Sequence, residues 1–170
     1  MVGWQKKKRT PNDLALRLFN WLLKFSGDFV ADATRDMEAH PGVQKHSWSE
    51  RMTNELMYFF LFALDYGISD HATAQQEKEA IRESLNYHWR QMIGDDENGQ
   101  IMWEISQQRL YEYAQIVNEA QTDEVHKLVG FGIKLAECSG WPEHPRLVAS
   151  APYLFKAAVE AVGVVLGEGK

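Results

Sequence analysis

Apolar side chains recur along the chain at steps of three and four residues, and no segment bounded by turn residues alternates apolar and polar positions. Steps of three and four place side chains on one face of an α-helix, whereas alternation is typical of a β-strand. The sequence therefore predicts an all-α protein, a single helical bundle of five to seven helices. The expected helices span about residues 12–34, 47–66, 70–94, 100–138 and 150–166.

Polar residues, glycine and proline indicate where these helices begin and end. The segment Ser47–Glu50, "SWSE", has the spacing of a capping box, in which two side chains satisfy free backbone amides at a helix start. Gly67 is expected to end the second helix, and Pro152 to lie near the start of the last. The helical spacing of apolar residues in 100–138 continues across "QTDE". In the same four residues, however, Thr122 would cap a new helix. That segment is therefore either one bent helix or two.

Nine consecutive apolar residues, Leu56–Leu64, form the most hydrophobic run of the chain. Nine helical residues rise about 14 Å, whereas the bilayer core, about 30 Å thick, needs about 20 apolar residues. We therefore expect no membrane span, and we expect this run to form the central helix of the core. Gly130 and Gly132, in "GFG", are expected to permit close contact between helices.

The first and last helices are apolar over most of their circumference. A bundle of this size would leave part of these surfaces exposed, and soluble monomers rarely expose apolar patches larger than a few hundred Å². A two-fold pairing would bury such a patch against itself, so we expect a homodimer. The preferred anchors are Trp21 and Phe25 on the first helix. The alternative interface is the last helix, with Leu154, Val162 and Val165.

The chain carries its charge unevenly. Its length of 170 residues is typical of one domain, and its net charge is −6. Residues 1–10 contain four basic and no acidic side chains, so the remainder, with 14 basic and 24 acidic groups, has a net charge of −10. We interpret residues 1–11 as a flexible basic arm and residues 12–170 as a single helical-bundle domain. Because the acidic domain repels phosphate, no nucleic-acid partner is expected.

Cys138 is the only cysteine, so an internal disulfide is excluded. The basic start "QKKKR" is followed by polar residues rather than by the apolar segment of a secretory signal, and a reducing cytoplasm is therefore expected. Cys138 lies at an expected helix C-terminus, where the helix dipole disfavours a thiolate. We do not expect it to act as a nucleophile.

Complete metal-binding patterns are absent from the sequence. Carboxylate-bridged di-iron bundles need a Glu followed three residues later by His, twice, and no Glu here has that neighbour. The loop "GDDENG" does not fit a calcium-binding loop, because Ile105 stands where a bidentate Glu is required. We expect no tightly bound metal and no cofactor. The weaker ligand pairs are His46 with Glu50, Asp36 with His40, and Asp123 with His126.

His88 is a polar residue on the apolar line of the third helix, and we expect it to face the bundle. One interpretation is a core or interface histidine that bonds to a neighbouring side chain. The other is a ligand-binding pocket that His88 forms with Glu55, Tyr58 and Asp65, which lie on nearly one face of the second helix.

Two classes of function remain open. The leading hypothesis is a non-enzymatic helical interaction or regulatory protein that acts as a homodimer. The alternative is a small-molecule- or metal-binding helical bundle, which could be an enzyme, with a polar pocket around His88. A cavity that brings together two or more of the four predicted polar groups would favour the alternative, and a filled core would favour the interaction protein.

Overall fold

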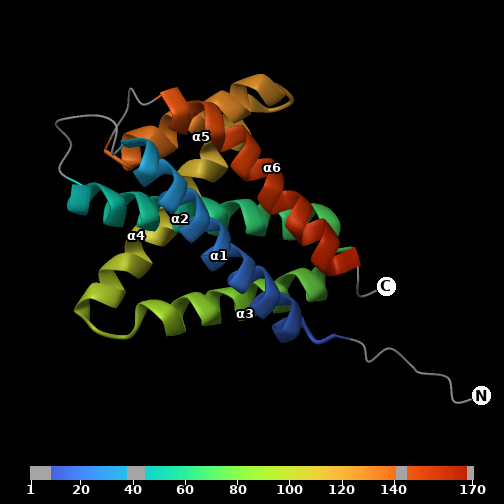
Figure 1. Ribbon diagram of the computed structural model, residues 1–170. Helices are drawn as coiled ribbons and strands as arrows, with labels where there is room; N and C mark the ends of the chain where they lie inside the picture. Colours follow the sequence, from blue (N-terminus) through green and yellow to red (C-terminus); the bar gives the residue numbers. More distant parts are fainter. Residues whose placement is uncertain (1–8, 38–44, 141–144, 168–170) are drawn as a thin grey trace, which may run out of the picture.

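The structure, a computed structural model, describes residues 9–37, 45–140 and 145–167. These residues form six α-helices and no β-strand, which confirms the predicted all-α bundle of five to seven helices (Figure 1). Most of the predicted basic arm, residues 1–8, lies outside the described residues. The helices are α1 (Pro11–Met37), α2 (Lys45–His71), α3 (Gln75–Ile93), α4 (Glu97–Ala120), α5 (Glu124–Cys138) and α6 (Pro145–Gly167).

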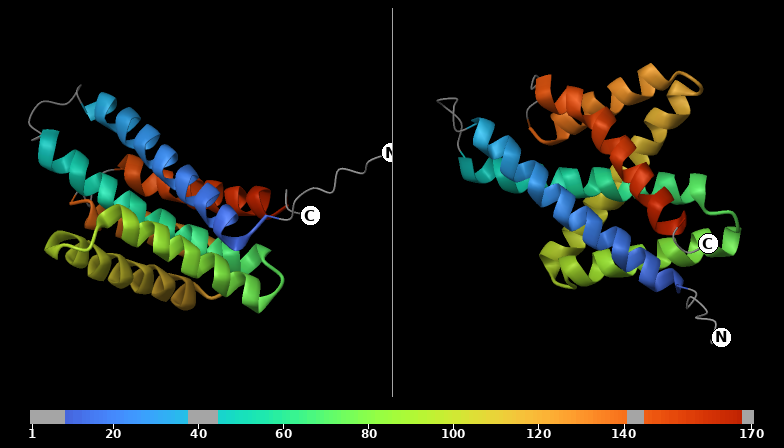
Figure 2. Two further views of the ribbon diagram at one scale, coloured as in Figure 1. Left: turned by 90° about the horizontal axis from the view of Figure 1, so that it is seen from below. Right: turned by 45° about the vertical axis from the view of Figure 1, so that its right-hand side comes forward.

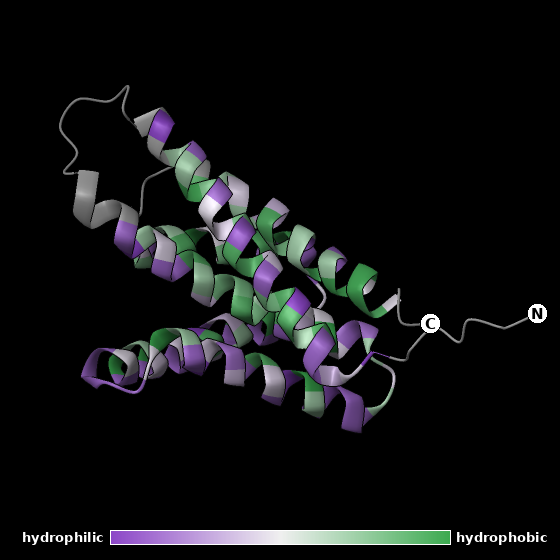
Figure 3. Ribbon diagram, turned by 60° about the horizontal axis from the view of Figure 1, so that its bottom comes forward, coloured by the Kyte–Doolittle hydropathy of each residue, from purple (hydrophilic) through white to green (hydrophobic). Residues whose placement is uncertain are grey.

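The helix α2 lies at the centre of the bundle. It contacts all five other helices, which surround it in two further views (Figure 2). Every residue of the run Leu56–Leu64 is buried except Met57, which is half-buried. Hydrophilic residues are concentrated on the outward sides of the surrounding helices (Figure 3). The prediction that this run forms the central helix of the core is therefore confirmed.

Aromatic side chains fill the space between α2 and three of its neighbours. The ring centroids of Phe59 and Tyr113 are 5.2 Å apart, those of Phe62 and Phe131 are 5.5 Å apart, and those of Phe131 and Phe155 are 4.8 Å apart. Such pairs contribute about 0.5–1.5 kcal/mol each beyond the area that they bury. Because the rings come from α2, α4, α5 and α6, they join four helices into one core.

The end of α2 and the start of α3 differ from the prediction. Helix α2 does not end at Gly67 but continues to His71. A Cβ atom at Gly67 would lie 3.0 Å from Cγ2 of Val162, so this glycine permits the close approach of α6 rather than ending a helix. Helix α3 begins at Gln75 rather than near Asp70.

The segment from 100 to 138 forms two helices. Helix α4 ends at Ala120, Gln121 has a positive φ of 50°, and α5 begins at Glu124. The predicted cap, Thr122, is wrong by one residue. Asp123 is the cap, because its carboxylate accepts a hydrogen bond from the backbone N–H of His126 at 2.9 Å and carries the negative charge that a helix start favours.

The two glycines of "GFG" lie where α5 contacts its neighbours, as predicted. Pro152 lies inside α6 rather than at its start, and proline has no N–H to donate to the carbonyl of Val148 four residues earlier. Gly132 lies against this carbonyl, since a Cβ atom there would be 2.4 Å from the Val148 oxygen. On the other side, a Cβ atom at Gly130 would be 2.7 Å from Cγ2 of Ile116.

The prediction of no membrane span is wrong. Residues Leu147–Gly167 of α6 form a helix of 21 residues with a mean hydropathy of 1.4, which is long and apolar enough to cross a bilayer. The run Leu56–Leu64, on which that prediction rested, is too short to cross a bilayer, but α6 is not. Length and composition alone are weak evidence for insertion, because core helices of soluble proteins share them. Here α6 lies along α2 and α5, and 33% of its most apolar 18-residue segment is buried.

Candidate functional site

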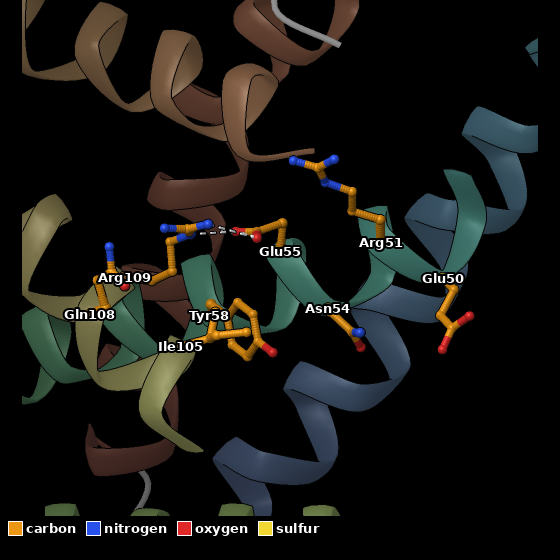
Figure 4. A pocket seen from close by; sticks show the side chains of 8 residues that line it. All are labelled: Glu50, Arg51, Asn54, Glu55, Tyr58, Ile105, Gln108 and Arg109. Atoms are coloured by element: carbon orange, nitrogen blue, oxygen red, sulfur yellow. Dashed lines mark hydrogen bonds and ion pairs between the residues drawn. The ribbon is translucent and has the colours of Figure 1, made fainter. Parts of the chain in front are cut away.

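A cavity of about 500 Å³ opens to solvent between α2 and α4. Its volume lies within the range of about 300–1,000 Å³ that is usual for small-molecule sites. All of its lining residues except Ile105 have a polar or charged end (Figure 4). They are Glu50, Arg51, Asn54, Glu55 and Tyr58 from α2, and Ile105, Gln108 and Arg109 from α4.

Three of the lining residues form a row along α2. Glu50, Asn54 and Tyr58 are spaced four residues apart, and this spacing places side chains one above another on a helix face. None of the three side chains makes a hydrogen bond or ion pair with any residue that the structure describes. The row therefore presents a carboxylate, an amide and a hydroxyl to the cavity, without partners among the described residues.

The hydroxyl of Tyr58 is a hydrogen-bond donor at neutral pH. Tyr58 is 2% exposed, and its ring packs perpendicular to the Trp89 ring, with a centroid distance of 5.8 Å. Burial, followed by the negative charge of Glu55, raises the pKa of Tyr58 to about 12. The phenol thus keeps its proton, and its ring is fixed against the core while its hydroxyl reaches the cavity.

An ion pair between Glu55 and Arg109 connects the two walls of the cavity. The two oxygens of Glu55 accept hydrogen bonds from Nε and Nη2 of Arg109, at 2.8 and 3.1 Å (Figure 4). The Glu55 side chain is 7% exposed and that of Arg109 is 17% exposed. The bonds to Glu55 raise the pKa of Arg109 above its ordinary value, so the guanidinium stays charged.

Two further ionic contacts extend this pair to α5. Nη1 of Arg109 donates to Glu112 at 3.0 Å, and Nζ of Lys134 contacts the same carboxylate at 3.2 Å. Glu112 keeps its charge, since hydrogen bonds from Gln108 and Lys134 outweigh burial and lower its pKa. An ionic network of four residues therefore runs from the wall of the cavity to α5.

The side chain of Arg51 lies at the end of α5. Its Nε donates a hydrogen bond to the backbone carbonyl of Cys138 at 2.7 Å, which satisfies one free acceptor at the helix C-terminus. Burial, followed by the charge of Glu55, raises the pKa of the Cys138 thiol to about 11. A thiol with a raised pKa is a poor nucleophile at neutral pH. Cys138 thus lies where the sequence predicted it, at a helix C-terminus.

The structure brings together two of the four residues predicted to form a pocket. Glu55 and Tyr58 line the cavity. Asp65 instead forms an ion pair with Arg82 of α3, in which Oδ1 of Asp65 lies 2.5 Å from Nε of Arg82. His88 projects from α3 toward α1, and its ring stacks on the Phe19 ring with a centroid distance of 5.9 Å. Its Nε2 atom is buried and has no hydrogen-bond partner among the described residues.

Most of the cavity was not found from the sequence. Glu55 gave one usable signal, because a carboxylate next to a long apolar run needs a cation as partner when it is buried. That partner is Arg109, 54 residues later on another helix, where Ser106 and Tyr113 on the same face are buried. Local spacing indicates that a partner is needed but does not identify it.

Among the residues described by the structure, no group of three or more His, Cys, Asp or Glu side chains could hold a metal ion. Of the three weaker ligand pairs, Asp123 and His126 form the cap of α5. The other two pairs lie at least partly outside the described side chains.

Comparison of the chain with protein-family models, with curated proteins and with solved structures finds no match.

Proposed function

We propose that the protein binds a small polar molecule in the cavity between α2 and α4. The observation that carries this proposal is the row formed by Glu50, Asn54 and Tyr58, whose polar ends have no partner among the described residues and line a cavity of about 500 Å³. Because the cavity is open, water can bond to these groups in the free protein. A ligand that replaces this water gains three hydrogen-bonding positions on one helix face, and such placed polar groups fix the orientation of a bound molecule.

The same groups favour recognition over catalysis. General acid–base catalysis requires side chains that can gain and lose a proton near the working pH. Tyr58, with a pKa of about 12, keeps its proton at neutral pH. Glu55 and Arg109 are bound to each other. These groups can position a ligand by hydrogen bonds and charge.

A thermal-shift screen of small polar molecules tests the proposal. Ligands should raise the melting temperature of the protein, and Asn54→Phe, which places a ring in the cavity, should abolish the shifts. Asn86→Phe makes the same exchange at an exposed position of α3 away from the cavity and should leave them unchanged. Shifts that persist in Asn54→Phe would place binding elsewhere and refute the proposal.

A second candidate function is the homodimeric interaction protein predicted from the sequence. Its expected anchors, Trp21 and Phe25, are half-buried in this chain. Their rings contact the Phe60 ring, with centroid distances of 5.5 and 5.6 Å. The observation that favours an interaction surface lies on α5 instead, where an apolar stripe at steps of four residues is exposed. It consists of Val125, Val129 and Ile133, which are 73%, 47% and 45% exposed.

Light scattering tests this second candidate. A homodimer through the stripe should give about twice the chain mass of 19.6 kDa, and Val129→Glu should return it to the monomer mass. If Trp21→Glu dissociates the dimer and Val129→Glu does not, the interface is α1. A wild-type protein that is monomeric at micromolar concentration would refute the homodimer on either face.

A further inference from the structure

We propose that the ligand of this cavity is a small zwitterion, with one ammonium group and one carboxylate separated by a short aliphatic chain. This inference rests on the proposed function and names the class of ligand. It follows from which charges in the cavity are already paired and which are free.

The charged lining residues divide into a paired set and a free set. Glu55 and Arg109 neutralise each other through two hydrogen bonds. Glu50 is exposed and has no ion-pair partner among the described residues. Among the described residues, Arg51 donates only from Nε, to the carbonyl of Cys138, and both Nη atoms keep their donors. The free charges are thus one carboxylate and one guanidinium.

A ligand with both charges matches this set better than a simple ion. A cation would pair with Glu50 and leave the Nη donors of Arg51 unused, and an anion would do the reverse. The lining has equal numbers of acidic and basic groups, so its net charge favours neither a cation nor an anion, while the acidic domain repels anions. An ammonium at Glu50 together with a carboxylate at Arg51 satisfies both residues.

The positions of the two free charges favour a ligand with separated ends. Successive residues of an α-helix project about 100° apart, and in Figure 4 the carboxylate of Glu50 and the guanidinium of Arg51 point in different directions. Several methylene groups between ammonium and carboxylate fit this arrangement better than one shared carbon. Ile105 offers an apolar contact for such a chain, and Asn54 and Tyr58 offer hydrogen bonds beside it.

Calorimetric titration with three matched probes tests the ligand class. 6-Aminohexanoate carries both charges, hexanoate only the carboxylate, and hexylamine only the ammonium. We expect 6-aminohexanoate to bind about two- to fivefold more tightly than either, the upper part of the range that one solvent-exposed ion pair contributes. Glu50→Gln should remove its advantage over hexanoate, and Arg51→Gln its advantage over hexylamine. Glu83→Gln, at an exposed position of α3, is the control and should change neither ratio.

The outcomes separate this inference from the proposed function. If hexanoate or hexylamine binds as tightly as 6-aminohexanoate, the ligand is not recognised by two charges; the zwitterion inference is then wrong, while binding in the cavity stands. If no probe binds and the thermal-shift screen finds no ligand, both fail. Arg51 also contacts α5, so Arg51→Gln could unfold the protein; in that case the comparison of Glu50→Gln with wild type decides alone.

Discussion

Removing Arg109 should destabilise the protein more than removal of any exposed charge. In Arg109→Met the two oxygens of Glu55 lose hydrogen bonds of 2.8 and 3.1 Å, and the carboxylate, only 7% exposed, stays in place. Breaking a buried pair by removing one partner costs about 3–5 kcal/mol. Because the cavity is open and water can reach Glu55, we expect the lower end, about 3 kcal/mol of unfolding free energy.

Urea unfolding of four variants measures this effect. The double variant Glu55→Met/Arg109→Met removes both charges, and it should recover most of the loss, because apolar residues of similar volume often replace a buried pair without cost. Lys24→Met is the control: its pair with Asp28 is exposed, and its effect should stay within about 0.5 kcal/mol. Glu55→Met alone should cost less than Arg109→Met, since Glu112 still holds Arg109. A loss below about 1 kcal/mol in Arg109→Met would refute the reasoning.

Two further predictions concern packing and pH. Gly132→Ala should lower the unfolding free energy by about 1–3 kcal/mol, because its Cβ would meet the Val148 oxygen at 2.4 Å. Gly27→Ala should raise the unfolding free energy by about 0.5–1 kcal/mol, because no described atom of a neighbouring element lies within 4 Å of the new Cβ. Thermal unfolding of both variants measures these changes. Burial in the folded protein raises the pKa of the Cys138 thiol from its ordinary value of 9.0 to about 11, so the unfolded chain loses the proton first as pH rises. Stability should therefore fall from pH 9 toward pH 11, and less steeply in Cys138→Ala; equal slopes in urea midpoints would contradict this.

The local pattern of the sequence was enough to predict the helices but not their exact ends. The run Leu56–Leu64 is apolar on all sides, and only a central helix buries all sides at once. At Gly67 the prediction failed because glycine has two roles, as a helix end and as a point of close contact. Which role applies depends on α6, whose Val162 lies against this glycine.

The candidate site could be predicted only where one helix supplies it. Glu55 and Tyr58 share a face of α2, and helical periodicity alone places them together. Asp65 is three turns away on the same helix, where Arg82 of α3 binds it. His88 faces α1 rather than α2, because stacking on Phe19 buries its ring there. These pairings depend on how the helices are arranged in space, which the spacing of residues within one helix does not encode.

The most direct test of ligand binding in the cavity is a backbone-amide NMR titration of the protein with 6-aminohexanoate. Saturable shifts concentrated on residues 50–58 of α2 and 105–109 of α4, and absent in Asn54→Phe, are the expected result. Saturable shifts concentrated on other helices, or no saturable shift with this probe or with any molecule from the thermal-shift screen, would contradict a ligand site between α2 and α4.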